Sequence, residues 1–413
     1  MPTAARERSS TVVLVGTLDT KGHEYTYLRD RVRERGVDVL LVDAGILGEP
    51  LVKPDVTRQE VAAAAGADVQ ALADAHDRAV ALETMGRGAA EVVCRLHAEG
   101  RLDAIGALGG TGGTTIATSA MRALPIGVPK LMVSTVASGD TSPYVDTSDV
   151  TMMHSVVDVA GINRVSSRII ANAARGLAGM ASGPDSSPAD EKPLIVASMW
   201  GVTTPCVTTA RERLEELGYD VLVFHQTGTG GRSMEELIAT GLVVGVLDIT
   251  TAELTQELVG GLFAAGPGRL ETAGRLGIPQ VVSLGGVEFV NVDPRSDPER
   301  FDGRPIYLHN EVIATTRTVP EECKKVAGVI AGKLNAATGP TVLFVPLRGL
   351  SLLSTEGEAL YDPVAEESLF SALRELVDPS KVEVHEIDAD LNHATFALAM
   401  AERLHELVVE VSR

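Results

Sequence analysis

Residues suited to binding phosphate gather in one short stretch, 103–118, which reads DAIGALGGTGGTTIAT. Four glycines fall within five positions there, interrupted only by Thr111. Without side chains, successive backbone N–H groups can turn inward toward an anion such as phosphate, and a helix that starts just afterwards adds the positive end of its dipole. The stretch is neither a Walker loop, because no Lys-Ser/Thr pair follows the last glycine, nor a clean GxGxxG turn. The alternative interpretation is a tight strand-to-helix connection in which glycine supplies a positive φ.

Polar residues also follow the first apolar run of the chain, TVVLVGT (11–17). The next residues include Asp19 and Lys21, and a lysine at the end of a strand is a point cation that can meet phosphate oxygens. A solvated lysine at a helix start is the alternative. Asp43 closes the following apolar run, where an acid of a nucleotide-binding fold contacts ribose hydroxyls, although helix capping would explain an aspartate there equally well.

Four side chains in the second half of the chain could carry out catalysis. Cys206 falls in the first turn of an expected helix, where the dipole favours the thiolate and makes it a candidate nucleophile. His225 is a candidate general base or metal ligand, Glu253 a proton carrier or second ligand, and Asp248 a further carboxylate. Their structural alternatives are a buried small thiol, a capping imidazole and acids that stabilise helix N-termini.

Other polar residues of this half are weaker candidates. Glu288 and Asn291 follow the fourth apolar run, and His309, Asn310 and Arg317 come later in YLHNEVIATTRT. Two carboxylates with an imidazole could hold a divalent ion, but a sequence does not give their mutual distances. Metal binding in the second half is therefore left open.

Apolar runs rich in β-branched residues alternate with segments of helical period, which predicts parallel sheets covered by helices. Strands are expected at 11–17, 37–44, 104–109 and 130–136, then at 193–200, 219–225, 243–249, 279–285, 341–347 and 382–387. Helices are expected at about 22–35, within 57–98, at 114–122 and 155–180, then at 206–217, 233–240, 251–260, 365–377 and from about 393.

The predicted fold is α/β, with two Rossmann-like, doubly wound parallel-sheet domains and a ligand cleft between them. The first domain covers 1–183, a linker rich in Pro, Ser, Gly and charge covers 184–193, and the second domain covers 194–413. Ligands of such sheets bind beyond the carboxyl ends of the strands. The polar stretches named above all follow strands, so they are expected to converge at those ends.

Composition excludes several classes of protein. Lys and Arg number 36 against 56 Asp and Glu, and the resulting charge of -20 would repel nucleic acid and anionic lipid. Three scattered cysteines fit neither a zinc site nor a disulfide framework, which favours a reducing, cytoplasmic location. The first apolar run is too short for a signal peptide, and no other run is long enough to span a bilayer. No nucleic-acid or membrane partner is therefore expected.

Several motifs together resemble a known family. They are GTLDTKGHE, GALGGTGGT, STVASGDTSPYVDTSDVTMMHSVVDVAGIN, GVTTPCV, FHQTGTGGRSMEELI, LDITTAEL and RLETAGRLGIPQVVS. Their order over nearly the whole chain resembles the ATP-binding domain of Tm-one-type plant tobamovirus-resistance proteins and their bacterial relatives. The resemblance implies two Rossmann-like domains, a nucleotide bound by the first, and a homodimer. The plant protein continues into a further C-terminal domain with no counterpart in this sequence, so its antiviral activity is not carried over.

The resemblance also implies a nucleotide pocket. Its residues are Thr17, Asp19, Lys21, Gly109, Gly110, Thr111, Gly112, Gly113, Thr114, Thr115, Ser138, Gly139, Asp140 and Thr141. The expected function is an enzyme that binds ATP, with or without Mg²⁺, and acts on a small molecule in the cleft. One alternative is an ATP-independent lyase or hydrolase acting on a carbonyl, acyl or phosphorylated substrate. Another is a nucleotide-dependent interaction module without catalysis.

Overall fold

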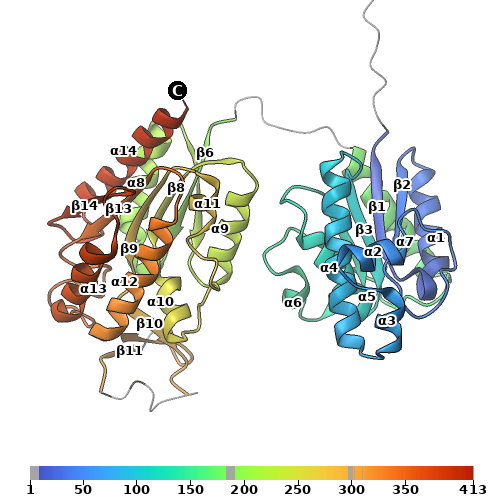
Figure 1. The fold of residues 1–413 in the computed structure, drawn as a ribbon, viewed down its shortest axis with the longest axis horizontal. Helices are drawn as coiled ribbons and strands as arrows, with labels where there is room; N and C mark the ends of the chain where they lie inside the picture. Colours follow the sequence, from blue (N-terminus) through green and yellow to red (C-terminus); the bar gives the residue numbers. More distant parts are fainter. Residues whose placement is uncertain (1–8, 183–190, 296–300, 302, 309, 413) are drawn as a thin grey trace, which may run out of the picture. The chain divides into compact units, whose positions relative to one another are not determined.

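The computed structural model describes residues 9–182, 191–295, 301, 303–308 and 310–412. The chain divides into two compact units, Met1–Ser187 (unit 1) and Pro188–Arg413 (unit 2), and both are drawn in Figure 1. Each is an α/β domain built on a parallel sheet, which confirms the predicted fold class. Most of the predicted linker, 184–193, lies outside the described residues, since β6 begins at Leu194 and only 191–193 precede it.

Unit 1 contains a five-stranded parallel sheet in the order β2-β1-β3-β4-β5. Its strands are β1 (Thr11–Gly16), β2 (Asp38–Asp43), β3 (Ala104–Gly109), β4 (Lys130–Ser134) and β5 (Thr151–His154). Runs such as VVLV and AIGAL are apolar throughout because helices cover both faces of the sheet. The short, half-exposed β5 had no such run and was not predicted.

The helices of unit 1 are α1 (Leu18–Arg33), α2 (Arg58–Ala64), α3 (Val69–Asp74), α4 (Arg78–Ala98), α5 (Thr111–Arg122), α6 (Ser142–Val145) and α7 (Ser166–Ser182). Helices α1 and α7 pack on one face of the sheet, and α2, α4 and α5 pack on the other. The chain therefore leaves neighbouring strands β1 and β3 toward opposite faces, which creates a crevice at their carboxyl ends. The predicted 155–180 helix begins only at Ser166.

Unit 2 contains a six-stranded parallel sheet in the order β14-β13-β9-β8-β6-β7. Its strands are β6 (Leu194–Met199), β7 (Asp220–His225), β8 (Val243–Thr250), β9 (Gln280–Gly285), β13 (Thr341–Pro346) and β14 (Val382–Ile387). Its helices are α8 (Thr204–Glu216), α9 (Thr229–Ala239), α10 (Ala252–Val259), α11 (Thr272–Leu276), α12 (Pro320–Asn335), α13 (Pro363–Leu376) and α14 (Ala394–Val411). Helices α8 and α14 cover one face, while α12 and α13 cover the other.

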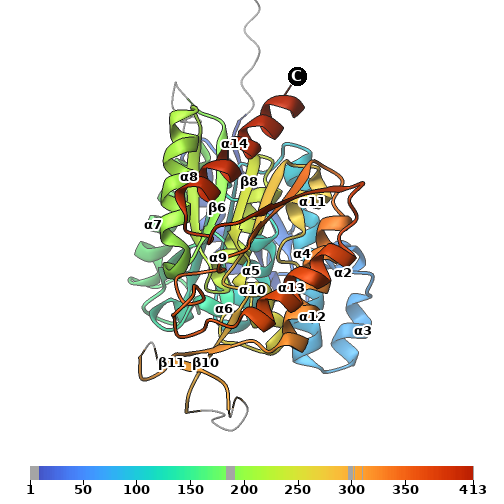
Figure 2. The ribbon, with the colours of Figure 1, turned by 90° about the vertical axis from the view of Figure 1, so that its left-hand side faces the viewer.

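A small antiparallel sheet is inserted between β9 and α12 of unit 2. It consists of β10 (Phe289–Val292), β12 (Ala314–Arg317) and β11 (Ile306–Leu308), with β12 in the middle. Figure 2 shows β10 and β11 at the lower end of the view. Neither this sheet nor α12 was predicted from the sequence. No helix in the described ranges is long and apolar enough to cross a membrane.

Candidate functional site

A cavity of about 510 Å³ opens in unit 1 where β1 and β3 end. Its volume lies within the range of about 300–1,000 Å³ that is usual for small-molecule sites. Polar lining residues are Thr17, Asp19, Thr20, Lys21, His76, Asp77, Arg78, Gly109, Gly110, Thr111, Gly112, Gly113 and Asp158. Apolar ones are Ala44, Ile46, Leu47, Leu72, Ala73, Ala81, Leu82, Met85 and Ile116. The cavity thus has one polar side, made by the N-termini of α1, α4 and α5, and one apolar wall.

The glycine loop between β3 and α5 supplies unpaired backbone donors to this cavity. Gly110 is the N-cap of α5 but has no side chain with which to cap it. The first backbone amide of α5 that makes a helical hydrogen bond is that of Thr114, which donates to the carbonyl of Gly110 at 2.9 Å. The N–H groups of Thr111, Gly112 and Gly113 have no hydrogen-bond partner within the described residues. These free amides and the dipole of α5 suit an anion.

Close packing, rather than backbone conformation, requires the glycines of this loop. None of its four glycines has a positive φ, so the conformational reason given for them in the alternative interpretation is wrong. A Cβ on Gly109 would lie 3.2 Å from the Cα of Gly113, and a Cβ on Gly112 would lie 3.1 Å from Nη2 of Arg78. The loop therefore keeps room for the helix backbone and for an arginine side chain.

Two unpartnered cations flank the cavity. Neither the ammonium of Lys21 nor the guanidinium of Arg78 makes a hydrogen bond or ion pair with any residue that the structure describes. Arg78 is the first residue of α4, whose N-cap Asp77 accepts hydrogen bonds from the amides of Ala79 and Val80 at 3.0 and 3.1 Å. The sequence analysis missed Arg78, and the available signal was an Asp-Arg pair at the start of a long amphipathic segment.

Asp19 and Asp43 hold the loops at the edge of the cavity. Oδ2 of Asp19 accepts hydrogen bonds from the amides of Leu47 and Gly48, at 2.7 and 3.3 Å. Asp43 is fully buried, and its Oδ1 accepts from the first amide of α1, that of Leu18, at 3.1 Å. Burial raises the pKa of the Asp43 carboxyl. Asp43 thus serves as a cap for α1, as the alternative interpretation had it.

Tyr25 joins the two strands beneath the cavity. Its hydroxyl donates to the carbonyl of Val15 in β1 at 2.6 Å and accepts from the amide of Leu108 in β3 at 3.0 Å. Gly16 leaves room for the ring, since a Cβ there would lie 2.0 Å from Cζ of Tyr25. Burial raises the pKa of the Tyr25 hydroxyl, which stays protonated. The strand ends that carry the cavity are therefore held together by a side chain.

The structure leaves some predicted pocket residues outside the cavity lining. Thr114 is buried, and its Oγ1 donates to the carbonyl of Gly110 at 2.8 Å, while Oγ1 of Thr115 donates to the carbonyl of Thr111 at 3.0 Å. Ser138, Gly139, Asp140 and Thr141 follow β4 and do not line the cavity. The carboxylate of Asp140 accepts from the amide and hydroxyl of Ser142. Thr17, Asp19, Lys21 and Gly109–Gly113 are the predicted residues that the cavity brings together.

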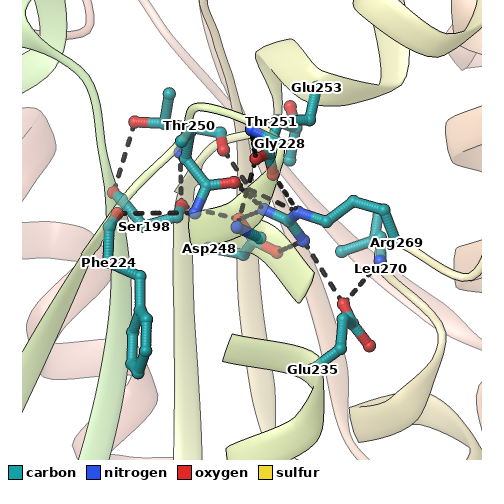
Figure 3. Close-up of polar contacts among 12 residues, drawn as sticks. Ser198, Phe224, Gly228, Glu235, Asp248, Thr250, Thr251, Glu253, Arg269 and Leu270 are labelled. Atoms are coloured by element: carbon teal, nitrogen blue, oxygen red, sulfur yellow. Dashed lines mark hydrogen bonds and ion pairs between the residues drawn. The ribbon is translucent and has the colours of Figure 1, made fainter. Parts of the chain in front are cut away.

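In unit 2 the predicted carboxylates surround a buried arginine that the sequence analysis did not single out. Figure 3 shows Arg269 with Asp248, Glu253 and Glu235 around it. Its Nη1 and Nη2 donate to the two oxygens of Asp248 at 2.5 and 2.7 Å, and its Nε donates to Oε2 of Glu253 at 2.8 Å. Although burial alone lowers the pKa of Arg269, Asp248 and Glu253 raise it well above the ordinary value. The arginine therefore stays charged.

Glu253 occupies the glycine loop at the start of α9. Its Oε1 accepts from the amides of Gly228 and Gly231 at 2.7 and 3.1 Å, and the side chain is fully buried. Burial raises the pKa of Glu253, and Arg269 together with these amides opposes the rise. The glycine loop of unit 2 is thus filled by the chain's own carboxylate, whereas that of unit 1 is free.

Cys206 and His225 lie in different surroundings from this cluster. Cys206, in the first turn of α8, points into the core and is fully buried, and its amide donates to Oδ1 of Asn392 at 3.2 Å. Burial raises the pKa of the thiol, so the expectation of a thiolate was wrong: removal from water outweighs the helix dipole. His225 is exposed at the end of β7, with its ring 6.3 Å from that of Trp200. No group of three or more His, Cys, Asp or Glu within the described ranges is arranged to hold a metal.

Comparison with known proteins covers both units. A UPF0261 protein of Clostridium tetani (strain Massachusetts / E88) is 47% identical over 394 residues, which are 95% of this chain and 98% of that protein. The ToMV resistance protein Tm-1(GCR237) of Solanum lycopersicum is 36% identical over 425 residues, and the match spans 98% of this chain but 56% of the plant protein. A solved UDP-N-acetylglucosamine 2-epimerase from Rickettsia bellii is 12% identical, covers 98% of this chain and 97% of its own, and has a TM-score of only 0.24.

The sequence also matches two domain models of one family. Residues 10–186 match the N-terminal domain of the uncharacterised protein family UPF0261, and residues 192–408 match its C-terminal domain. The plant relative agrees with the resemblance drawn from the motifs, whereas ATP binding stays a prediction. Because the two domain models together cover most of the sequence, the chain belongs to the UPF0261 family.

Proposed function

We propose that unit 1 binds a nucleotide, ATP with or without Mg²⁺, in the cavity between the ends of β1 and β3. The observation that carries this proposal is the set of free amides at Thr111, Gly112 and Gly113 in a cavity flanked by unpartnered Lys21 and Arg78. In a chain of net charge -20, two cations without carboxylate partners favour an anionic ligand. The resemblance to an ATP-binding plant domain supports the same choice.

The proposed orientation follows from the two sides of the cavity. The phosphates lie at the glycine loop, where the backbone amides donate and Lys21 and Arg78 neutralise charge. The base lies against the apolar wall that includes Leu72, Leu82 and Met85. Glycine at position 112 keeps Arg78 close to the loop, so a larger side chain there would displace the arginine and narrow the phosphate site.

The wider functional proposal is a cytoplasmic homodimeric enzyme that acts on a small molecule, with ATP as a co-substrate or a regulator. Catalysis by Cys206 is disfavoured because the thiol is buried and protonated. Catalysis by Asp248 and Glu253 is disfavoured because both carboxylates pair with Arg269. His225 stays a candidate because its ring is exposed.

Light scattering at micromolar concentration tests the dimer, and a monomer would contradict it.

A thermal-shift screen tests the ligand. The probes are ATP, AMP, acyl-CoA and sugar phosphates, each with and without Mg²⁺. A ligand at about a hundred times its dissociation constant adds roughly 2.7 kcal/mol to the free energy of unfolding, so ATP should raise the melting temperature by a few degrees. A larger shift with acyl-CoA or a sugar phosphate would favour the lyase or hydrolase alternative instead.

A pair of glycine variants locates the site. Gly112→Val should abolish the shift with ATP because the new side chain would meet Arg78 and Leu82 at 3.1 and 3.3 Å. Gly179→Val is the control, since it also replaces a helical glycine of unit 1 but has no atom within 4 Å of the added Cβ. Normal ATP binding by a folded Gly112→Val variant would place the ligand elsewhere.

A further inference from the structure

A second buried polar cluster lies in unit 2, around Arg317. It joins Glu288, which follows β9, with Arg317 at the end of β12 and Glu366 in the first turn of α13. All three side chains are almost fully buried, with exposed fractions of 0% for Glu288, 2% for Arg317 and 5% for Glu366. The sequence analysis named Glu288 and Arg317 without a role, and it missed Glu366.

The guanidinium of Arg317 donates its hydrogen bonds mainly to backbone carbonyls. Its Nη1 donates to the carbonyl of Glu288 at 2.6 Å, and its Nη2 donates to the carbonyl of Asp362 at 3.3 Å. The carboxylate of Glu366 lies 3.7 Å from Nη2, beyond hydrogen-bond distance. Oε1 of Glu366 and Oε2 of Glu288 are buried without a hydrogen-bond partner in the part of the chain that the structure describes. Glu288 and Glu366 thus lie beside the single cation Arg317, and each keeps one carboxylate oxygen without a hydrogen bond from a described residue.

Glu366 also lines a cavity of about 420 Å³ in unit 2. The lining contains the apolar surfaces of Leu347, Tyr361 and Phe370, together with charged residues. Its two arginines are already paired: Arg348 with Asp388 at 2.5 Å, and Arg374 with Glu367 at 3.0 Å and Glu386 at 2.6 Å. Glu356, also in the lining, has no ion pair with a described residue.

The charges of this cavity favour a cationic ligand. An anion would have to displace a carboxylate from Arg348 or Arg374, which are paired at 2.5 to 3.0 Å. A cation instead meets Glu356, which has no ion pair with a described residue, and Glu366, whose pair with Arg317 is long at 3.7 Å. An ionised carboxylate that is almost fully buried beside a single cation at 3.7 Å is costly to keep, and a second positive charge in the cavity would lower that cost. An aromatic ring such as that of Phe370 or Tyr361 is a favourable neighbour for an organic cation.

We propose that this cavity binds a small organic cation, a primary amine, whose ammonium group pairs with the carboxylate of Glu366. Its carbon chain lies against Leu347, Tyr361 and Phe370. The proposal concerns unit 2 alone and does not depend on nucleotide binding by unit 1.

Binding of such a ligand is coupled to a proton on Glu366. Burial, with a smaller contribution from the charge of Glu288, raises the pKa of Glu366 to about 7, while Arg317 and Ser354 oppose the rise and Asp362 adds to it. From the cavity side, Glu366 is faced by Arg348, Glu356, Glu367, Arg374 and Asp388. An ammonium group binds the ionised carboxylate, so its binding displaces the proton, and affinity should fall as the pH drops below 7.

Isothermal titration calorimetry of the full chain with n-butylamine, n-butanol and butyrate tests the proposal. The amine keeps its charge between pH 6 and 8, whereas Glu366 goes from about one tenth to about nine tenths ionised over that interval. Affinity for n-butylamine should therefore rise about tenfold from pH 6 to pH 8. The alcohol and the acid should bind at least tenfold more weakly at pH 8.

Two neighbouring variants separate the buried carboxylate from general surface charge. Glu366→Gln keeps the shape of the side chain and should lower amine affinity at least tenfold at pH 8, with no remaining dependence on pH. Glu367→Gln removes an exposed charge from the same cavity and should change affinity less than threefold. If Glu366→Gln does not fold, the pH dependence of the unaltered protein decides the question. Equal binding of n-butanol, stronger binding at pH 6, or no binding of n-butylamine at 10 mM and pH 8 would each overturn the proposal.

Discussion

Two buried acids of unit 2, Glu253 and Glu366, differ in how their oxygens are satisfied. Glu253 receives two backbone amides and an arginine within hydrogen-bond distance. Glu366 has its cation at 3.7 Å, and its Oε1 accepts no hydrogen bond from any residue that the structure describes. The first arrangement is complete and stabilises the fold, and the second leaves an acid whose charge state depends on pH.

Removing the cation of the completed network should destabilise unit 2 strongly. Arg269→Met leaves Asp248 and Glu253 buried without their partner, and breaking a buried ion pair in this way costs about 3–5 kcal/mol. Urea denaturation followed by circular dichroism measures the change in the free energy of unfolding. Arg275→Met, at an exposed position six residues later, is the control and should change it by less than about 0.5 kcal/mol. Equal, small losses for both variants would contradict this account.

The pKa of Glu366 predicts a dependence of stability on pH. Because burial raises the pKa from 4.5 to about 7, the folded chain binds a proton more tightly than the unfolded chain. This contribution is fully present below about pH 4.5 and is lost as the pH rises through about 7, with a size on the order of 3 kcal/mol. Thermal unfolding between pH 5 and 8 should show the loss, and Glu366→Gln should remove it, whereas Glu367→Gln should not. An unchanged profile in Glu366→Gln would rule out this residue as the cause.

Single residues were predicted from the sequence only where a local pattern marked them. The glycine loop and Lys21 follow strands, and strand ends can be recognised from apolar runs. Arg78 begins α4 and is marked in the sequence only by the Asp-Arg pair at the start of that amphipathic segment. Arg269 lies in a loop that has no periodic pattern, and its partner Asp248 lies far away in the sequence. Cys206 was placed correctly at a helix start but given the wrong ionisation, because its burial depends on α14 packing over α8.

At the scale of elements, the glycine loop before α9 is matched to the side chain of Glu253. Gly231→Ala would place a Cβ 1.9 Å from Oε2 of Glu253 and force the carboxylate away from its partners. The variant should lose on the order of 3 kcal/mol of stability, even though alanine favours a helix. Gly179→Ala, in the open part of α7, should be neutral or stabilising by up to about 1 kcal/mol. Denaturant titration of both variants measures the difference, and a neutral Gly231→Ala would show that the loop can move.

Most long elements were predicted, whereas the long helix α12 and the short or inserted strands were not. Each strand of the two parallel sheets except β5 was predicted, and the signal is clearest in strands buried on both faces, such as β3, β9 and β13. The sheet of β10, β11 and β12 lacks that signal, since β11 is exposed and its pairing with β12 depends on a long-range register. Segment 57–98 forms three helices because Gly66 and His76 adopt positive φ between them.

For the whole molecule, separate cores predict separate unfolding. The cores of unit 1 and unit 2 share no residue. Differential scanning calorimetry should therefore resolve two transitions, or one broad transition that fits two components. ATP should move only the component of unit 1, and Arg269→Met should move only that of unit 2. A single cooperative transition displaced equally by both changes would contradict this prediction.

The surroundings of Trp200 give unit 2 an optical signal that unit 1 lacks. This is the only tryptophan of the sequence, and its ring meets those of Phe263 and Phe289 edge-on, with centroids 5.5 and 5.6 Å away. Indole emission from the intact chain therefore arises wholly in unit 2, and it will report the loss of that packing without any label. Far-UV ellipticity, by contrast, arises in both units. Subtracting the normalised emission curve from the ellipticity curve isolates the behaviour of unit 1, so one unmodified sample can assign each ligand to its unit.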